Sequence, residues 1–154
     1  MQLATFQNKM IPLLEQHMRH YLAQFTENKT LQAAMQYSLE AGGKRIRPLL
    51  IMLICQSLEK KIDTDVLSVA GSLEFLHTYS LIHDDLPEMD NDDLRRGKPT
   101  NHKVFGQDIA VLAGDALLTE AFGWLAKTKL TPKKRITLVA ALAKAAGANG
   151  MVAG

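Results

Sequence analysis

The feature that most constrains this chain is a long apolar segment that runs without a break into a dense acidic run. Residues 66–83 read VLSVAGSLEFLHTYSLIH and contain one acid and no Lys or Arg. Apolar side chains lie almost all round a helix drawn through this segment, which is typical of a helix buried in a core. Asp63 is a good N-cap for its start, and Pro87 disfavours helical backbone at the residue before it. The sequence therefore predicts a core helix over residues 63–86.

Five further segments carry apolar residues at the three- and four-residue spacings of a helix. They cover residues 3–25, 30–40, 48–60, 107–127 and 132–148. No segment shows the alternation of a strand, and no internal repeat is present. The 154 residues, 47% of them hydrophobic and 22% charged, are enough for one domain with a real core. We therefore expect an all-α fold of about six helices in a single domain over residues 1–154.

Prolines and glycines mark expected helix boundaries. Pro12 lies inside the first segment and predicts a break or a kink there. Gly42 and Gly43 suit the end of the second helix, because glycine readily adopts left-handed backbone, and Pro48 is placed to open the third.

Six acids lie within ten residues at the end of the predicted core helix: Asp84, Asp85, Glu88, Asp90, Asp92 and Asp93. Like charges this close repel one another unless a cation lies among them. Carboxylates that leave open positions for water and phosphate are the usual ligands of Mg²⁺. Asp84 lies on the last helical turn and Asp90 beyond the proline, so the two are predicted to grip one ion. The alternative is a solvated, self-neutralising loop, which charge alone leaves open.

Two basic clusters accompany the acids: Arg95, Arg96 and Lys98 directly after them, and Lys44, Arg45 and Arg47 in the segment GGKRIRP. Guanidinium and ammonium groups suit the phosphate oxygens that a metal does not hold. The alternative for GGKRIRP is plain surface, since it lacks the spacing of a P-loop. These clusters favour a diphosphate ligand beside the metal.

Two polar residues stand out on otherwise apolar helices. His77 lies seven residues before Asp84, about two helical turns, so the two share a face. It is either a structural core histidine or a phosphate contact. Asp115 lies within an apolar face, and because a buried acid needs a partner we expect a structural or supporting role for it.

Composition excludes several other classes. The net charge of +2 is too small to indicate a nucleic-acid partner. A single cysteine, Cys55, cannot form an internal disulfide and is expected to be a small buried hydrophobe. The first residues lack the pattern of a signal peptide, and no apolar run suggests a membrane span, so we expect a cytoplasmic protein.

Four motifs, in this order, carry a resemblance to a known family: GGKRIRP, LIHDDLPEMD, DDLRRGKPTNH and LAGDALL. The chain from about Ala33 onward resembles the N-terminal half of bacterial short-chain trans-polyprenyl diphosphate synthases, farnesyl diphosphate synthases most of all. The resemblance implies an isoprenoid synthase-type helical bundle. It also implies a Mg²⁺-dependent enzyme that joins an allylic diphosphate, dimethylallyl or geranyl, to isopentenyl diphosphate.

The resemblance implies roles for individual residues. The metal ligands would be Asp84 and Asp90, with Asp85 assisting. The substrate ligands would be Arg95 for the allylic diphosphate and Lys44, Arg47, His77 and Arg96 for isopentenyl diphosphate. Tyr79, with its neighbour Ser80, would limit product length, because a bulky ring five residues before Asp84 is similar to the arrangement in producers of the C15 farnesyl chain. A geranylgeranyl or longer-chain synthase would differ chiefly at these two positions.

The sequence departs from the family in one respect, because no second aspartate-rich motif follows Asp115. We therefore expect a partial synthase domain that is inactive on its own and leaves apolar helix faces uncovered. The alternative from another class is a non-catalytic half-bundle that binds Mg²⁺ and diphosphate weakly or pairs with another subunit. For complete chains the resemblance implies a homodimer.

Overall fold

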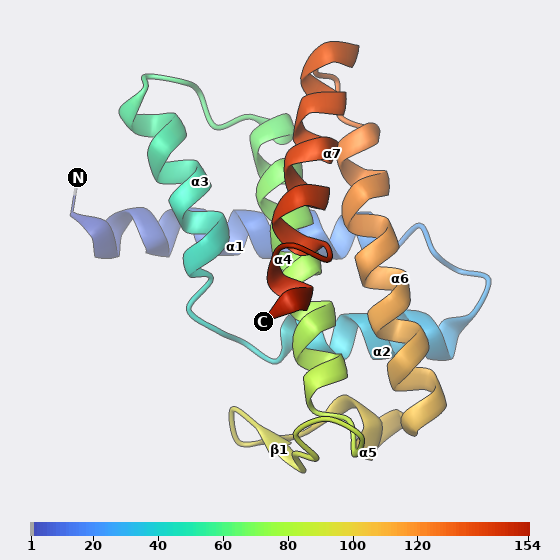
Figure 1. Ribbon diagram of the computed structural model, residues 1–154. Helices are drawn as coiled ribbons and strands as arrows, with labels where there is room; N and C mark the ends of the chain where they lie inside the picture. The colour runs from blue at the N-terminus through green and yellow to red at the C-terminus, as the bar shows by residue number, and fades with distance from the viewer. Residues whose placement is uncertain (1) are drawn as a thin grey trace.

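A computed structural model describes residues 2–154 of the chain, and the elements follow one another as Figure 1 shows. The helices are α1 (Leu3–Leu22), α2 (Lys29–Glu40), α3 (Ile46–Ser57), α4 (Thr64–Asp84), α5 (Asn101–Phe105), α6 (Gln107–Ala126) and α7 (Pro132–Ala146). A short hairpin, β1 (Leu94–Arg95) and β2 (Lys98–Pro99), precedes α5, and the 3-10 turn η1 (Met151–Ala153) ends the chain.

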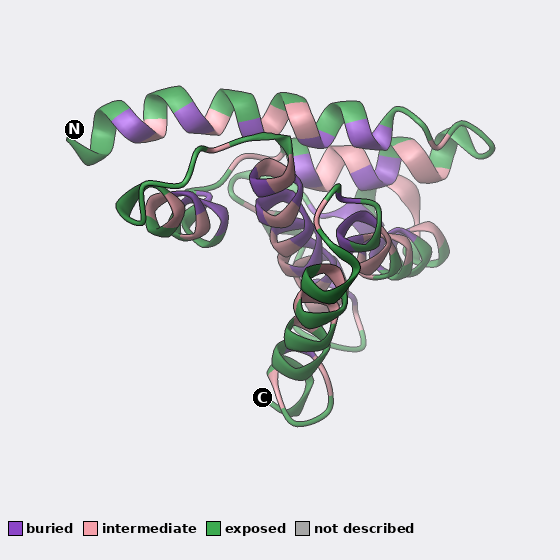
Figure 2. Cartoon of the chain, turned by 90° about the horizontal axis from the view of Figure 1, so that it is seen from above, coloured by how far each residue is buried: buried purple, intermediate pink, exposed green. Residues whose placement is uncertain are grey.

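Helix α4 is the centre of the bundle, as the apolar segment predicts. It packs most extensively against α6 and next against α3, while α1 and α2 run crosswise to it (Figure 1). Seen from above, α1 turns its buried side towards the other helices and its exposed side outward, whereas α7 projects away and is largely exposed (Figure 2). The fully buried Phe75 lies at the middle of α4, against the ring of Trp124 at a centroid distance of 5.0 Å.

Local chemistry explains where the helices begin. The side chain of Asp63 accepts a hydrogen bond from the N–H of Val66 at 3.0 Å, and Asn28 caps α2 in the same way. These N-caps satisfy amide groups that have no partner within the helix. The core helix therefore begins at the predicted cap and ends at Asp84, with Asp85 as its C-cap.

The prediction of an all-α bundle is confirmed, with local differences. The short helix α5 brings the number of α-helices in residues 2–154 to seven. The hairpin was not predicted, because strands of two residues are too short to show alternation. Its turn needs positive φ at Arg96 (54°) and Gly97 (76°), which matches the right-handed twist of the paired strands. Helix α1 continues through Pro12, and α3 begins at Ile46, two residues before the proline expected to open it.

Two segments have the length and mean hydropathy of a membrane span, Gln107–Ala126 and Pro132–Ala153, which the sequence analysis did not predict. Helix α6 packs against α4 and α2, which accounts for the apolar residues on its buried side. One or two such helices are weak support for a membrane span.

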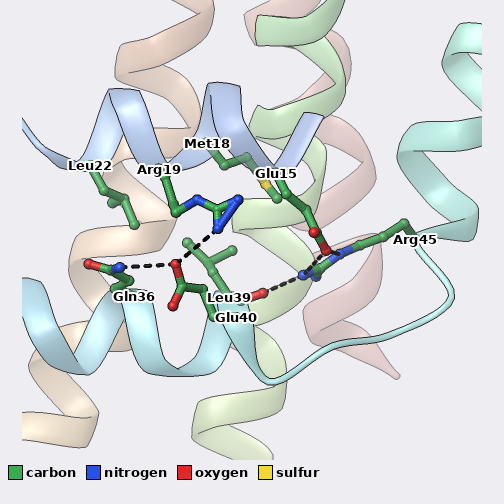
Figure 3. A pocket seen from close by; sticks show the side chains of 8 residues that line it. All are labelled: Glu15, Met18, Arg19, Leu22, Gln36, Leu39, Glu40 and Arg45. Atoms are coloured by element: carbon green, nitrogen blue, oxygen red, sulfur yellow. Dashed lines mark hydrogen bonds and ion pairs between the residues drawn. The ribbon is translucent and has the colours of Figure 1, made fainter. Parts of the chain in front are cut away.

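The loop between α2 and α3 is anchored by an arginine. Arg45 is the N-cap of α3, with φ of 49°, and its side chain is 1% exposed. Its guanidinium reaches back towards α1 and α2, beside a cavity of about 230 Å³ that Glu15, Arg19 and Glu40 also line (Figure 3). The buried side chain of Arg45 thus anchors the loop to α1 and α2.

Candidate functional site

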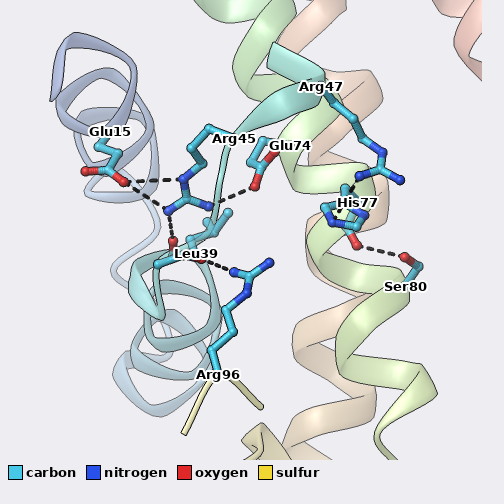
Figure 4. Close-up of polar contacts among 9 residues, drawn as sticks. Glu15, Leu39, Arg45, Arg47, Glu74, His77, Ser80 and Arg96 are labelled. Atoms are coloured by element: carbon cyan, nitrogen blue, oxygen red, sulfur yellow. Dashed lines mark hydrogen bonds and ion pairs between the residues drawn. The ribbon is translucent and has the colours of Figure 1, made fainter. Parts of the chain in front are cut away.

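Four of the predicted phosphate ligands surround one cavity. Lys44, Arg47, His77 and Arg96 line a space of about 460 Å³ together with Gly43, Arg45, Ile46 and Glu74. They come from the loop after α2, the start of α3, the middle of α4 and the hairpin turn, and Figure 4 shows Arg47, His77 and Arg96. Several cations facing one open cavity suit a strongly negative ligand such as a diphosphate.

Arg47 and His77 are in direct contact at the wall of the cavity. Nη1 of Arg47 lies 3.4 Å from Nε2 of His77. Burial, followed by the positive charge of Arg47, lowers the pKa of His77 below its ordinary value of 6.5. The imidazole is therefore mainly neutral at pH 7 before an anion binds, and it can accept or donate a hydrogen bond.

Arg96 closes the cavity from the hairpin side. Its Nη1 donates a hydrogen bond to the carbonyl oxygen of Gly42. A Cβ at Gly43 would lie 2.6 Å from the same Nη1, and the backbone there has a φ of 141°. Glycine is favoured at position 43 because its φ is one that residues with a side chain rarely adopt, whereas the flexible Arg96 side chain could move aside.

The backbones of the two predicted metal ligands meet at the end of α4. The N–H of Asp90 donates to the carbonyl oxygen of Asp84 at 2.8 Å, so the chain turns back after Pro87. Asp84 is half-buried and Asp90 is exposed. No group of three or more His, Cys, Asp or Glu in residues 2–154 is arranged as a complete metal site. Carboxylates that are not enclosed by other ligands are nevertheless the type of ligand that suits Mg²⁺, which keeps several positions for water and phosphate.

Asp85 points elsewhere and has a partner of its own. It is 3% exposed, and its two carboxylate oxygens accept hydrogen bonds from Nε and Nη2 of Arg95 at 2.7 to 3.1 Å. These bonds raise the pKa of Arg95. The structure thus uses Asp85 to hold Arg95 beside the acidic end of α4, and Nη1 of Arg95 remains outside this pair.

Tyr79 and Ser80 lie on α4 between the basic cavity and the acidic end. The ring of Tyr79 is buried and packs edge-on against His83 at a centroid distance of 5.6 Å, and burial raises the pKa of its hydroxyl. Ser80 is half-buried and donates to the carbonyl oxygen of His77 at 2.7 Å. Their roles in product length stay predictions.

Two expectations about single residues need revision. Asp115 was expected to be a buried acid, but its side chain is 57% exposed and its carboxylate lies 3.7 Å from Nε2 of His83. It lies on the exposed side of α6. Because apolar residues occur nearly all round this helix, the sequence does not show which side is buried. Cys55 is only partly buried and lines an apolar groove beside α7.

The acids that hold Arg45 were not predicted from the sequence. Nη1 of Arg45 lies 2.8 Å from Glu74, which is 3% exposed, and Nη2 lies 3.2 Å from Glu15. The one sign of this ion pair in the sequence is an isolated acid, Glu74, in the apolar core helix. A buried acid there requires a buried cation.

Stability is expected to fall as the pH is lowered from 8 to 5.5. Burial lowers the pKa of both His17 and His77 in the folded chain. Above pH 6.5 neither the folded nor the unfolded state carries these protons. Below it the unfolded state binds them first, so folding stability is lost as the pH falls through 6.5 towards the lower folded values. Urea unfolding at several pH values measures this loss, and His77→Gln should reduce it. An unchanged slope in that variant would contradict the contribution of His77.

Comparison with known proteins identifies the family. Residues 28–151 match the family model described as Polyprenyl synthetase. The chain is 54% identical over 153 residues to a farnesyl diphosphate synthase of Geobacillus stearothermophilus, covering 97% of this chain and 51% of the relative. It is 55% identical over 128 residues to the large subunit 1 of a heterodimeric chloroplastic geranylgeranyl pyrophosphate synthase of Arabidopsis thaliana, covering 80% of this chain and 34% of that relative.

The fold is similar to that of solved relatives as well. The crystal structure of a geranyltransferase from Legionella pneumophila superposes with a TM-score of 0.91 at 36% identity, covering 97% of this chain and 54% of the other. The chain spans about half the length of the curated bacterial relative that it matches. With the cationic cavity and the paired aspartates placed as described, these matches show that the chain belongs to the polyprenyl synthetase family.

Proposed function

We propose that this chain supplies one wall of the active site of a Mg²⁺-dependent prenyltransferase that makes farnesyl diphosphate. The substrates are isopentenyl diphosphate and an allylic diphosphate, dimethylallyl or geranyl. The observation that carries the proposal is the convergence of Lys44, Arg47, His77 and Arg96, from four parts of the chain, on one cavity. The name and the 54% identity of the Geobacillus relative support the choice of product.

Each group has a role that follows from its charge. Asp84 and Asp90 would hold Mg²⁺, and the ion would supply positive charge beside the leaving diphosphate. Arg95, oriented by Asp85, binds the same diphosphate with its free Nη1. The cavity of Lys44, Arg47, His77 and Arg96 binds isopentenyl diphosphate.

The reaction then follows from placing two substrates side by side. The allylic C–O bond breaks, and its electron pair leaves with the diphosphate. The alkene of isopentenyl diphosphate forms the new C–C bond to the allylic cation, and loss of a proton restores a double bond. Fixed cations around the oxygens stabilise the charge as it develops, which is where most of the rate enhancement arises.

The complete protein is proposed to act in the cytoplasm as a homodimer. Both substrates are small charged diphosphates, and no nucleic-acid partner is implied. Because the chain spans about half of its curated bacterial relative, these properties are proposed for the whole enzyme.

A second candidate function is a non-catalytic half-bundle that pairs with another subunit. It is favoured by a stripe of exposed apolar residues on and just after α3: Ile46, Leu50, Ile54 and Leu58. They are spaced by four and more than half exposed, so they present one apolar face to a partner.

Incubation of the purified chain with Mg²⁺, labelled isopentenyl diphosphate and geranyl diphosphate separates the two functions. A C15 product shows the complete reaction. Mg²⁺-dependent binding of pyrophosphate in calorimetry without turnover supports an active-site wall. Oligomers on sizing with neither turnover nor binding would contradict the proposal and favour the second candidate.

Product length gives a further prediction. Tyr79→Ala opens space on α4 five residues before Asp84, so we expect products longer than C15. The test uses a chimera that joins this chain to the part of the Geobacillus relative that it does not span, with chromatography of the products. Tyr79→Phe keeps the ring and should keep C15, while C15 alone from Tyr79→Ala would exclude Tyr79 as a determinant. A C20 product from the unaltered chimera would favour the geranylgeranyl alternative.

A further inference from the structure

Arg45 lies at the cationic cavity, yet its guanidinium is occupied by contacts with other groups of the protein. Nε and Nη2 lie 3.3 and 3.2 Å from Glu15 of α1, Nη1 lies 2.8 Å from Glu74 of α4, and Nη2 also donates to the carbonyl oxygen of Leu39 (Figure 4). These contacts use four of the five N–H groups of a guanidinium. Arg45 therefore has little capacity left for a ligand.

The backbone at Arg45 explains why so many contacts are needed. Its φ of 49° lies in the left-handed region, where a residue with a Cβ is strained. Gly42 and Gly43, just before it, adopt positive φ without that cost. A strained residue persists when the surroundings hold it firmly, and such residues gather at binding sites. Here the ion pairs of Arg45 with Glu15 and Glu74 stabilise its left-handed backbone.

The held residue lies between two ligands of the cavity. Lys44 precedes Arg45 directly and Arg47 follows two positions later, so the path of the chain at Arg45 determines where both side chains start. Glu74 is three residues before His77, one turn along the same face of α4. The ion pair between Arg45 and Glu74 therefore fixes the loop with respect to His77.

We propose that Arg45, held by Glu74 and Glu15, is a positioning residue that sets Lys44 and Arg47 against His77 without touching the substrate. The inference deepens the proposed function, since it concerns the cavity assigned to isopentenyl diphosphate. A residue that only braces the fold would contribute to stability and leave the geometry between Arg47 and His77 unchanged when it is replaced conservatively.

Arg45→Lys is the decisive variant, because it keeps the positive charge but loses the fork that joins Glu15, Glu74 and Leu39. Arg19→Lys is its matched control. Arg19 borders the neighbouring cavity in Figure 3 and makes a half-exposed ion pair with Glu40 at 3.7 Å. Both variants are compared with the unaltered chain by calorimetry with pyrophosphate and isopentenyl diphosphate, and by NMR titration of the histidine rings, with His77→Gln for assignment.

In Arg45→Lys we expect a roughly tenfold or greater loss of affinity for both anions, because small displacements of several ligands act together. We also expect the pKa of His77 to rise towards 6.5, since Arg47 no longer lies against it. Arg19→Lys should change neither quantity. A folded Arg45→Lys chain with an unaltered His77 titration and unaltered affinity would overturn the inference.

Two other results also bear on the inference: a failure of Arg45→Lys to fold, and a failure of the unaltered chain to bind either anion. If Arg45→Lys does not fold, Glu15→Gln decides in its place, because Glu15 is partly exposed and its loss releases one arm of the guanidinium. A shift of the His77 titration in the same direction supports the inference, and no shift overturns it. Failure of the unaltered chain to bind either anion would contradict the proposed function, while the His77 titration still tests Arg45.

Discussion

Replacing Asp84 with asparagine is expected to remove most of the Mg²⁺-dependent affinity of the chain for pyrophosphate. Asparagine keeps the size of the side chain but loses the charge that binds a hard cation. Changes in residues that merely support a metal ligand cost about 10 to 100-fold in affinity, so loss of a direct ligand should cost at least roughly 100-fold. Calorimetry with pyrophosphate, with and without Mg²⁺, measures the effect.

Glu88→Gln is the matched control for this substitution. Glu88 is exposed and belongs to the same acidic run, so its replacement removes the same formal charge from the same segment. Its effect on affinity should be small. Equal losses in the two variants would show that the acidic run acts only through its total charge, and would exclude Asp84 as a specific ligand.

Gly71→Ala is expected to destabilise the fold by about 1–3 kcal/mol, as overpacking of a core does. A Cβ at Gly71 of α4 would lie 2.5 Å from Cζ3 of Trp124 on α6. The indole ring is stacked on Tyr21 at a centroid distance of 4.2 Å and on His17 at 5.4 Å, so it has little room to move. Urea unfolding followed by the fluorescence of Trp124 gives the loss.

Gly123→Ala on α6 provides the comparison. Its Cβ would meet the end of the flexible Glu120 side chain at 3.2 Å, and alanine favours helix over glycine by up to about 1 kcal/mol. We expect stability within about 1 kcal/mol of that of the unaltered chain. If both variants lost the same stability, glycine content rather than the contact between α4 and α6 would be responsible.

The sequence predicts most of the fold because the helices have strong local signals. The apolar run before Asp84, the cap at Asp63 and the break at Pro87 define α4 to within two residues at each end. Helix α3 likewise begins two residues from its predicted start at Pro48, because GGKRIRP becomes helical at Ile46, directly after the left-handed backbone of Arg45. The hairpin depends on its turn and on contacts with the rest of the fold. The spacing of apolar residues along the sequence shows neither of these.

The candidate site was predictable in its residues but not in their partners. Charge and resemblance indicated Lys44, Arg47, His77 and Arg96, and the structure brings all four to one cavity. That Asp85 holds Arg95 could not be predicted, since neighbouring aspartates look equivalent in a sequence. The direction of each carboxylate depends on where a helix ends and on what packs against it.

The hairpin carries two adjacent arginines that face different neighbours. Arg95 holds Asp85 at the end of α4, whereas Arg96 reaches the loop carbonyl of Gly42 on the opposite flank. One small turn consequently supports both the cationic cavity and the acidic end of α4. Under the proposed function, changes at Gly97 or in its two strands are expected to weaken the binding of both diphosphates together, because each of the two sites depends on one arginine of this turn.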